Sequence, residues 1–368
     1  MNRKIKFLNY ILPILFTICA LFFVVYLCST RYFMSMGETM VKFIVGALIA
    51  GFFHALLHEL GHYYGGKKNS FVFSEMVVWF FKWKKQGKKV KFEFVMMGNE
   101  AGYTQMIPSD ESVVEKGLKI MTRGGIIASI LLMLVGIVPI FFVEISPWIY
   151  CIWVMFFPIG IYYFLGNALP KETMGVRNDG AVLFGIKKND DQTKTIYSLL
   201  KIQAFLYNGK TPSEIDEKYY FNLPQLPEDN LTFIMLLSAR YSYYLDKGDY
   251  ENAKKTTERM LSLEDYMSKE NHMLVMAEDL YNRCTFDFDE NKADDLMEDL
   301  EDYLNGIDTA TNIRIKLAYL VYVVKENEGL DYIYNKGIKQ AKKSHLKGLG
   351  IMEQRLLTKI REDGRNLA

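Results

Sequence analysis

Residues 40–63 read MVKFIVGALIAGFFHALLHELGHY and end in the motif HELGH at residues 58–62. The run is long enough to cross a bilayer, which takes about 20 mostly apolar residues in a helix. Ionisable side chains inside such a run are costly, and proteins keep them there mainly where they act. This stretch therefore predicts a membrane-spanning helix with a polar site at one end.

Three other segments have the same apolar character, at Phe7 to Cys28, Ile126 to Val143 and Trp148 to Leu165. The first follows a basic start, as a signal peptide does. We interpret it as an uncleaved span, because its apolar stretch is long and no small-residue cleavage site follows it. The sequence thus predicts an all-α polytopic membrane protein with about four transmembrane helices.

The connections between these segments differ in their content of Lys and Arg. Basic residues precede the first span and are frequent between the second and third, whereas the two opposite connections carry only Arg31 and, just inside the second span, Lys42. Positive residues are retained on the cytoplasmic side of a membrane. We therefore expect a multi-pass protein of a bacterial cell membrane, surrounded by lipid, with both termini in the cytoplasm.

The segment between the second and third spans carries strand patterns. Residues 71–83 are rich in aromatic and β-branched side chains, residues 89–94 alternate charged with apolar ones, and residues 85–88 (KQGK) supply a turn. This predicts a membrane-associated β-hairpin within about residues 70–107, with a third short strand at 101–107. The alternative is a plain surface hairpin whose apolar side rests on the membrane or on the spans.

The composition changes along the chain. Half of the 368 residues are hydrophobic, but from about residue 188 the chain is rich in Asp, Glu, Lys and Tyr. We therefore expect a transmembrane domain at 1–187 and a cytoplasmic helical domain at 188–368. The net charge of +1 argues against nucleic acid as a partner. The four cysteines form no C-x-x-C pair, which argues against a disulfide framework and a thiolate zinc site.

The HELGH motif has the spacing of a zinc site. His58 and His62 lie one turn apart on one helix face, so both imidazoles can reach a single zinc ion, while Glu59 can reach a water on the metal. The zinc activates this water, and Glu59 can take its proton as general base. His54 lies a turn further along the same face, where its depth favours a supporting or pore-lining role outside the metal set.

A zinc site of this kind needs a third protein ligand. Candidates lie beyond the fourth span in residues 167–180 (NALPKETMGVRNDG), on the same expected side of the membrane as His62. The proline and glycines of this stretch favour non-helical backbone, which membrane proteins tolerate where it lines a watery cavity. Asp179 is one candidate ligand and Glu172 is its competitor.

Together these residues resemble the site-2 protease family of intramembrane zinc metalloproteases. The resemblance covers about residues 40–186 and rests on HELGH in one span, followed by N-x-x-P and then D-G after another. It implies zinc binding by His58, His62 and Asp179, a general-base role for Glu59, and substrate positioning by Asn167 and Pro170. Two features depart from the family. The interval from Pro170 to Asp179 is longer than usual, and no PDZ-like segment is present.

The resemblance also implies a role for the hairpin that begins at Phe71. Relatives carry β-structure between the motif helix and the next span. A protease that cuts a membrane-spanning segment must first unwind it, because the amides of a helix are already hydrogen-bonded. An exposed strand edge can pair with the unwound segment, so the hairpin is a candidate substrate-presenting edge.

The C-terminal half shows a weak helical repeat. Residues 239–253 (ARYSYYLDKGDYENA) resemble the helix–turn–helix of a tetratricopeptide repeat, with Gly248 and Asp249 at the turn. A solenoid of such helical hairpins could bind a substrate tail or an adaptor on its concave face. An ordinary α-helical domain with aromatic core stripes is the alternative.

The sequence therefore predicts a zinc metalloendopeptidase that cleaves a membrane-anchored peptide or protein within or near its spanning segment. A non-proteolytic membrane receptor or immunity protein, binding a peptide through the helical domain, is a rival of a different class. The intact Glu59 argues against it. A zinc-dependent carrier is the weaker rival, because transport does not need a base beside the ligands.

Overall fold

A computed structural model describes the chain at residues 3–32, 35–87, 89–96, 98, 101–141, 145–173, 175–306, 308–326 and 328–367. Lys88 of the predicted turn and Val143, the predicted end of the third span, lie outside these ranges. The described part is mostly helical, with two small sheets. Its contacts divide the chain into a first unit, residues 1–107 with 113–193, and a second unit, residues 108–112 with 194–368.

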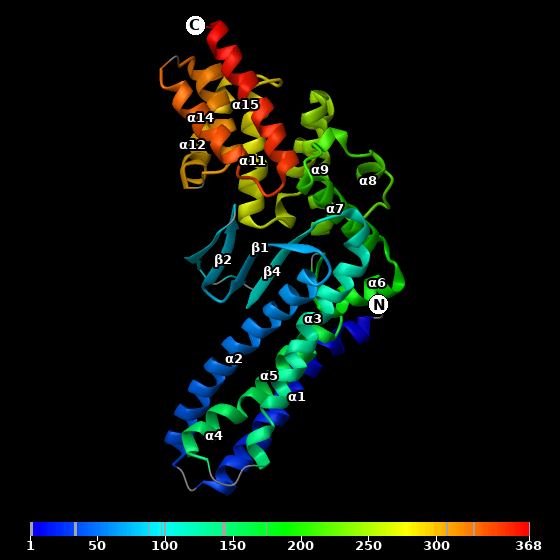
Figure 1. The fold of residues 1–368 in the computed structure, drawn as a ribbon, viewed down its shortest axis with the longest axis vertical. Helices are drawn as coiled ribbons and strands as arrows, with labels where there is room; N and C mark the ends of the chain where they lie inside the picture. The colour runs from blue at the N-terminus through cyan, green and yellow to red at the C-terminus, as the bar shows by residue number, and fades with distance from the viewer. Residues whose placement is uncertain are drawn as a thin grey trace. The chain divides into compact units, whose positions relative to one another are not determined.

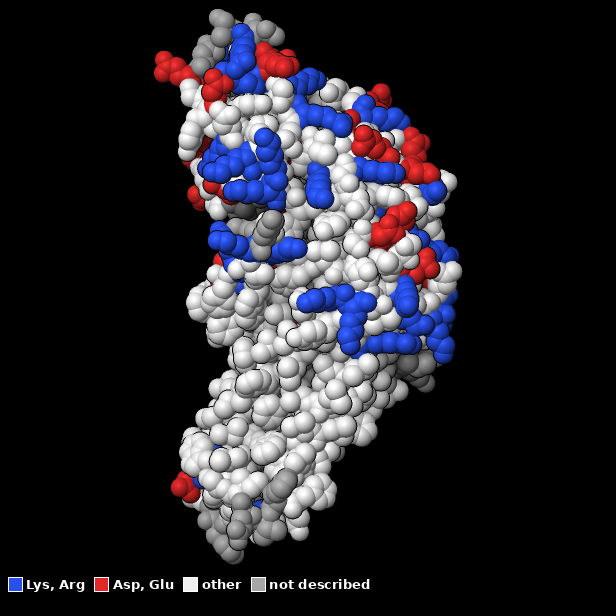
Figure 2. Space-filling view, viewed as in Figure 1, with Lys and Arg blue, Asp and Glu red and all other residues white. Residues whose placement is uncertain are grey.

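Four stretches of the described residues are long and apolar enough to cross a membrane, namely Phe7–Arg31, Gly37–Lys67, Glu111–Phe141 and Pro147–Ala168. They correspond to helices α1 (Arg3–Arg31), α2 (Met36–Lys67), α3 (Val114–Val135), α4 (Pro147–Val154) and α5 (Phe156–Ala168) (Figure 1). Figure 2 shows few charged side chains over these helices on the face in view, and Lys and Arg gathered in the region of α6. The prediction of four apolar spans is confirmed.

The fourth span is not the single helix that its apolar run predicts. Helix α4 ends at Val154 and α5 begins at Phe156, with Met155 between them. Pro158 is the cause, because a proline has no N–H to donate and its ring crowds the carbonyl four residues earlier, which belongs to Val154.

The sheet of the first unit is larger than the predicted hairpin. Strands β1 (Phe71–Val78), β2 (Phe81–Gln86), β3 (Lys89–Phe94) and β4 (Gly102–Pro108) form a sheet in the order β3-β2-β1-β4. The prediction of one strand over residues 71–83 is wrong, because Trp79 has a left-handed φ of 55° and turns the chain between β1 and β2. The third strand expected at 101–107 is present as β4.

Two contacts fix α2 within the first unit. Gly61 of α2 meets Gly124 of α3 so closely that a Cβ on Gly61 would lie 2.3 Å from the carbonyl oxygen of Gly124. On another side of the helix, Met76 and Val78 of β1 pack on Ala55. Small residues at a helix contact allow such close approach in membranes. The motif helix is thus held between α3 and the sheet.

The chain leaves the fourth span through a short hairpin and a helix. Strands β5 (Glu172–Thr173) and β6 (Val176–Arg177) pair, and α6 (Asp179–Lys188) follows directly. Asn178 begins this helix, because its side chain accepts a hydrogen bond from the backbone N–H of Ala181 at 3.0 Å.

The second unit consists of helices that pack on their neighbours along the chain. α9 packs on α10, α11 on α12, and α14 on both α13 and α15. At the predicted turn, Gly248 has φ 77° and Asp249 caps α10. Arg314 is fully buried between Glu278 and Glu353. The helices are α7 (Asp191–Tyr207), α8 (Lys218–Phe221), α9 (Leu231–Lys247), α10 (Tyr250–Leu261), α11 (Lys269–Cys284), α12 (Glu290–Gly306), α13 (Ala310–Ala318), α14 (Leu330–Ala341) and α15 (Lys347–Leu367).

Candidate metal centre

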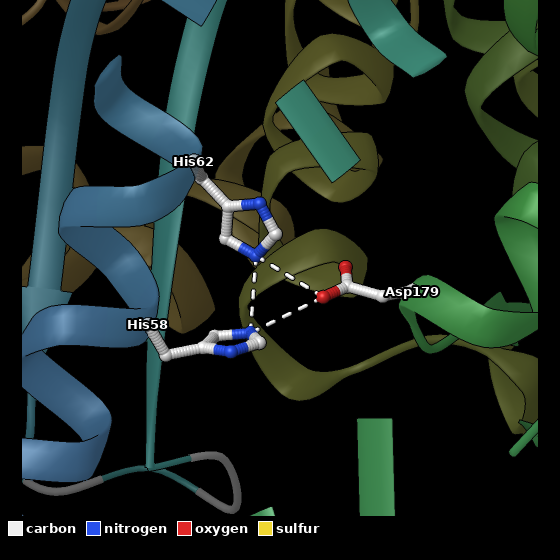
Figure 3. Close-up of side chains that lie close together, drawn as sticks. All are labelled: His58, His62 and Asp179. Atoms are coloured by element: carbon white, nitrogen blue, oxygen red, sulfur yellow. Dashed lines mark hydrogen bonds and ion pairs between the residues drawn. The ribbon is translucent and has the colours of Figure 1, made fainter. Parts of the chain in front are cut away.

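Three predicted site residues converge in the first unit. His58 and His62 project from α2, and Asp179 projects toward them from the first turn of α6 (Figure 3). Asp179 Oδ2 lies 3.2 Å from Nε2 of His58 and 3.4 Å from Nε2 of His62, and the two Nε2 atoms are 3.1 Å apart. Among the described residues, this is the group of His, Cys, Asp and Glu side chains whose donor atoms lie close enough to hold a metal ion.

These separations suit a tetrahedral ion. Ligands about 2.05 Å from zinc at tetrahedral angles lie about 3.35 Å from one another. The measured separations of 3.1 to 3.4 Å are close to that edge length. Two imidazoles and a carboxylate form a donor set that zinc favours, and they leave a fourth position open. The residues present therefore fit a zinc ion.

Helix α3 fixes the direction of both imidazoles. His62 Nδ1 lies 2.9 Å from the backbone oxygen of Met121, which can only accept, so Nδ1 donates and Nε2 is the nitrogen that faces His58 and Asp179. His58 Nδ1 lies 2.9 Å from Oγ of Ser129. Partners of this kind orient metal-binding histidines and set which nitrogen faces the metal.

Gly125 of α3 leaves room for the two rings. A Cβ at this position would lie 2.5 Å from both Cε1 and Nε2 of His62 and 2.8 Å from Cε1 of His58. No side chain larger than hydrogen fits there while both rings keep their positions. Gly125 is therefore part of the site, although it offers no ligand atom.

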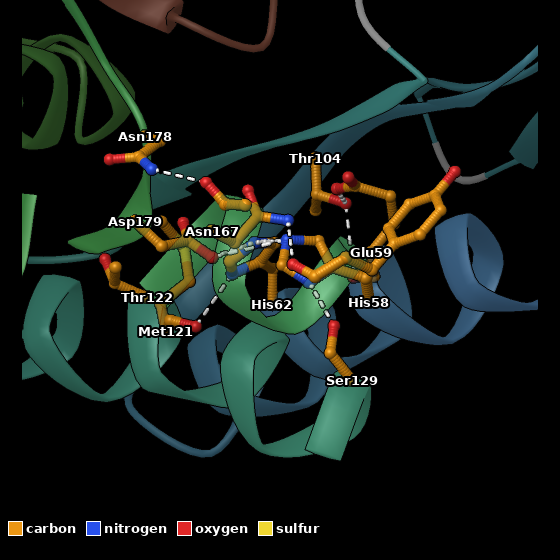
Figure 4. A network of polar contacts seen from close by, with 12 residues as sticks. His58, Glu59, His62, Thr104, Met121, Thr122, Ser129, Asn167, Asn178 and Asp179 are labelled. Carbon is orange, nitrogen blue, oxygen red and sulfur yellow. Dashed lines mark hydrogen bonds and ion pairs between the residues drawn. The ribbon is translucent and has the colours of Figure 1, made fainter. Parts of the chain in front are cut away.

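Glu59 lies beside the two histidines, on the sheet side of α2. Thr104 of β4 donates from Oγ1 to Glu59 Oε2 at 2.7 Å (Figure 4). Gly102 lies next to the same side chain, since a Cβ there would be 3.1 Å from Cγ of Glu59. The carboxylate is nearly buried, with 5% of the residue exposed. The sheet thus holds one carboxylate oxygen of Glu59 through Thr104.

Asn178 connects Asp179 to the end of the fourth span. Its Nδ2 donates to the carbonyl oxygens of Gly166 at 2.7 Å and Leu169 at 2.8 Å, while Oδ1 accepts from the N–H of Lys171 at 2.9 Å and of Ala181 at 3.0 Å. All four hydrogen-bonding positions of this amide are used. Asn178 therefore positions its neighbour Asp179.

The predicted substrate-positioning residues lie along the same segment. Asn167 is near the end of α5 and donates to the carbonyl oxygen of Tyr163 at 3.0 Å. The carbonyl oxygen of Pro170 accepts from Nδ2 of Asn9, a buried polar side chain in α1, at 2.9 Å. Neither contact involves His58, His62 or Asp179.

Glu172 and His54 have other partners. Oε2 of Glu172 accepts from Nε of Arg177 at 2.9 Å, across the small hairpin, and Glu172 is outside the ligand cluster. His54 is fully buried, with Nε2 3.0 Å from the carbonyl oxygen of Phe156 and its ring stacked on Tyr163 at 5.5 Å. Of the two acidic candidates, the structure brings Asp179 to the histidines.

The charge state of Asp179 suits a metal ligand. Burial acts to raise the pKa of this carboxyl, but the neighbouring histidines outweigh it and lower the pKa to about 2. Asp179 is therefore a carboxylate at neutral pH, which is the form that binds metal ions.

Sequence reasoning missed three residues that orient the site, namely Ser129, Thr104 and Asn178. For Asn178 a signal was present, because an Asn just before an acidic first turn is a typical helix start. The others depend on which faces of α3 and β4 meet α2. The spacing of residues along the sequence does not show which faces meet.

Comparison with known proteins gives no further guide to this geometry, since no family model, no curated protein and no solved structure matches the chain.

Proposed function

We propose that this protein is an intramembrane zinc endopeptidase that resembles site-2 proteases and cleaves a peptide segment in or next to the membrane. The observation that carries the proposal is the cluster of His58, His62 and Asp179, with donor atoms 3.1 to 3.4 Å apart, in a unit whose helices can span a membrane. Zinc bound by these three residues supplies a Lewis acid and an activated water.

Glu59 has the position expected of a general base. Thr104 occupies its Oε2, so we assign proton transfer to Oε1. This oxygen takes a proton from the attacking water and returns it to the nitrogen of the leaving amine. The hydrogen bond from Thr104 also limits rotation of the carboxylate, so that the same oxygen serves both steps.

Strand β4 is the part of the sheet next to Glu59. Since the sheet order is β3-β2-β1-β4, the free edge of the predicted hairpin, β3, lies at the opposite side. We assign the substrate-presenting edge to β4. An unwound substrate segment that pairs there would lie against the strand that holds the general base.

The second unit is assigned a recruiting role. In this proposal its consecutive helices form a tetratricopeptide-like repeat domain. The helix–turn–helix at Gly248 and Asp249 is the clearest repeat. Such a domain in the cytoplasm could bind a substrate tail or an adaptor, which would raise the local concentration of the scissile segment at the site.

The experiment compares wild type with Glu59→Gln, both purified in detergent. Zinc content is measured by mass spectrometry of the metal, and cleavage is followed on a tagged single-span test protein with helix-breaking residues in its span. Because Glu59 is a base and not a ligand, Glu59→Gln should keep its zinc and lose cleavage by several orders of magnitude, whereas His58→Ala should lose both.

Glu38→Gln is the matched control, because it makes the same change in the first turn of the same helix. It should leave zinc content and cleavage unchanged. Loss of zinc in Glu59→Gln would exclude the base assignment. The receptor alternative would be favoured if the wild type bound zinc but cleaved neither the test protein nor any protein that Glu59→Gln had trapped.

A further inference from the structure

Two cysteines from distant parts of the chain are in contact in the first unit. Sγ of Cys28 in α1 lies 3.7 Å from Sγ of Cys151 in α4, although the two residues are 123 positions apart in the sequence. Both residues are fully buried, and both are free thiols. Because the contact joins two different helices, the spacing of the cysteines along the chain could not indicate it.

The pair lies near one end of the spans. In Figure 1, α4 is at the opposite end of the first unit from α6. Cys28 lies three residues before α1 ends at Arg31, and Cys151 lies four residues after α4 begins at Pro147. At 1.5 Å per residue, each cysteine is about 5 to 6 Å from the end of its helix. The pair is therefore about one helical turn from the end of the first span and from the start of the fourth.

Two basic side chains flank the pair. Arg31 and Lys42 are the basic residues of the sequence at this end of the spans. Cζ of Arg31 lies 4.9 Å from the ring centroid of Tyr150, which directly precedes Cys151. Nζ of Lys42 lies 5.3 Å from the ring centroid of Trp148, one turn before Cys151, and Lys42 is only 6% exposed.

This arrangement of cations favours thiol chemistry. A cation buried in a span is costly, and proteins keep one there mainly where it acts. Positive charge beside a cysteine favours the thiolate, which is the form that attacks a disulfide. Both basic residues at this end of the spans thus lie beside the turn of α4 that carries Cys151.

A bond between the two sulfurs requires only a small movement. The S–S distance in a disulfide is about 2.05 Å, so the sulfurs must approach by about 1.7 Å. Rotation of the two thiols about their Cα–Cβ bonds moves the sulfurs by distances of this size. The helices that carry Cys28 and Cys151 can therefore be joined near the positions that they already have.

We propose that Cys28 and Cys151 form a redox site, at which a disulfide joins the first span to the fourth. On the orientation expected from the distribution of Lys and Arg, this end of the spans faces the outside of the cell, where disulfides form and persist. The inference rests on that proposed orientation and needs neither zinc nor catalysis.

The bond forms in two exchange steps, with a small-molecule or protein disulfide as the oxidant. The thiolate of one cysteine attacks a sulfur of the oxidant, which forms a mixed disulfide and releases the other sulfur of the oxidant as a thiolate. The thiolate of the second cysteine then attacks the first cysteine's sulfur, and the remaining sulfur of the oxidant leaves as a thiolate. The two protons of the cysteines pass to the two leaving thiolates. The pair loses two electrons, and the oxidant is reduced to two thiols.

The bond fastens one end of α1. At its other end, α1 is held by the hydrogen bond from Nδ2 of Asn9 to the carbonyl oxygen of Pro170 at 2.9 Å. The oxidised protein therefore holds α1 at both ends, against the fourth span and against the segment that follows it. In the reduced protein, only noncovalent contacts hold the end that carries Cys28.

Differential alkylation tests the site in the full chain, reconstituted in nanodiscs of phosphatidylcholine and phosphatidylglycerol. The background Cys19→Ser with Cys284→Ser leaves the pair as the remaining cysteines. The protein is equilibrated with oxidised and reduced glutathione at a series of ratios, and free thiols are blocked with N-ethylmaleimide. The protected cysteines are then reduced, labelled with a second maleimide and counted by mass spectrometry of the intact chain.

The two cysteines should become protected together. The fraction of chains with two protected cysteines should rise from near zero to near one as the ratio of oxidised to reduced glutathione increases. Before reduction these chains should carry no glutathione, which distinguishes an internal disulfide from two mixed disulfides. Should the background fail to fold, peptide mapping of the disulfide in wild type gives the same answer.

Tyr26→Cys combined with Cys28→Ser is the matched control. It moves the thiol by two residues to a position on α1 that is 63% exposed. Because this position lies on another face of the helix, the variant should form no internal disulfide with Cys151 at any glutathione ratio.

Three results overturn the proposal. If the folded protein keeps both thiols free at every ratio, Cys28 and Cys151 are packing residues only. If iodine, which dissolves in the bilayer, is needed to form the bond, the thiols are in contact but do not exchange with a disulfide. If glutathione, which does not cross membranes, oxidises the pair in inverted vesicles but not in right-side-out vesicles, the site faces the wrong compartment. None of these results bears on zinc binding or cleavage, so the proposed function is tested separately.

Discussion

Gly125→Ala should remove zinc from the site while the fold remains. The added Cβ would lie 2.5 Å from Cε1 and Nε2 of His62. Heavy atoms in ordinary contact are about 3.5 Å apart or more, so His62 and the new methyl group must separate by about 1 Å. Moving α3 away instead would lengthen the hydrogen bonds that Met121 and Ser129 make with the two imidazoles.

The size of the effect follows from the tolerance of zinc coordination. Ligand distances in zinc sites stay within about 0.2 Å of their usual values, so a displacement of about 1 Å is several times the tolerance. Changing an outer partner of a zinc ligand costs about 10- to 100-fold in affinity. Displacing a ligand itself should lower zinc affinity by at least the upper end of this range, about 100-fold, which corresponds to about 2.7 kcal/mol of binding free energy.

Affinity is measured by competition with a chromophoric chelator, and folding by circular dichroism and size-exclusion chromatography. Gly166→Ala is the control, since it makes the same change in α5 with no atom within 4 Å of the new Cβ. It should bind zinc as wild type does. If folded Gly125→Ala bound zinc with unchanged affinity, the proposed ligand geometry around the two imidazoles would be wrong.

Three further predictions concern the third ligand, its support and the sheet. Asp179→Ala should weaken zinc binding far more than Glu172→Ala in the same chelator assay, and the reverse order would transfer the ligand role to Glu172. Asn178→Ala should lower zinc affinity about 10- to 100-fold. Asn178→Asp keeps the helix cap but loses both donated hydrogen bonds, so its zinc affinity should lie between those of Asn178→Ala and wild type. Equal zinc affinity in all three proteins would refute a positioning role. Burial acts to raise the pKa of Glu75, but hydrogen bonds from Tyr103 and Lys82 lower it below the usual 4.5. The ionised Glu75 therefore stabilises the fold above pH 4.5, and this stabilisation is lost as the pH falls through the lowered pKa. The thermal stability of wild type should exceed that of Glu75→Gln at neutral pH, and the difference should shrink in acid. A difference that stays constant with pH would contradict the assignment.

The spans could be predicted because the bilayer imposes a length and a composition that a sequence records directly. The break of the fourth span could also have been predicted, because Pro158 is in the sequence. The apolar run alone indicated one helix. The division of residues 71–83 into two strands could not be predicted from the sequence. Trp79 turns the chain with φ 55°, although bulky residues rarely adopt a positive φ and none of the usual turn residues is present there.

The site divides in the same way. His58, Glu59 and His62 follow from one helix, where spacing determines which side chains share a face. Asp179 lies on another element, and the sequence left it in competition with Glu172 because separation along the chain does not determine distance in space. In the fold Arg177 engages Glu172, whereas Asp179, next to Asn178, lies against the histidines.

The contacts around the cluster involve every span of the first unit. α2 contributes both histidines, α3 orients them through Met121 and Ser129, and the segment after α5 supplies Asp179. α1 participates through Asn9, which donates to Pro170 between the fourth span and Asp179. A buried amide inside an apolar span is costly unless it is hydrogen-bonded, so this contact ties α1 to the segment that carries Asp179. Any motion that separates α1 from that segment must break this bond, which couples the position of the first span to the geometry of the cluster of His58, His62 and Asp179.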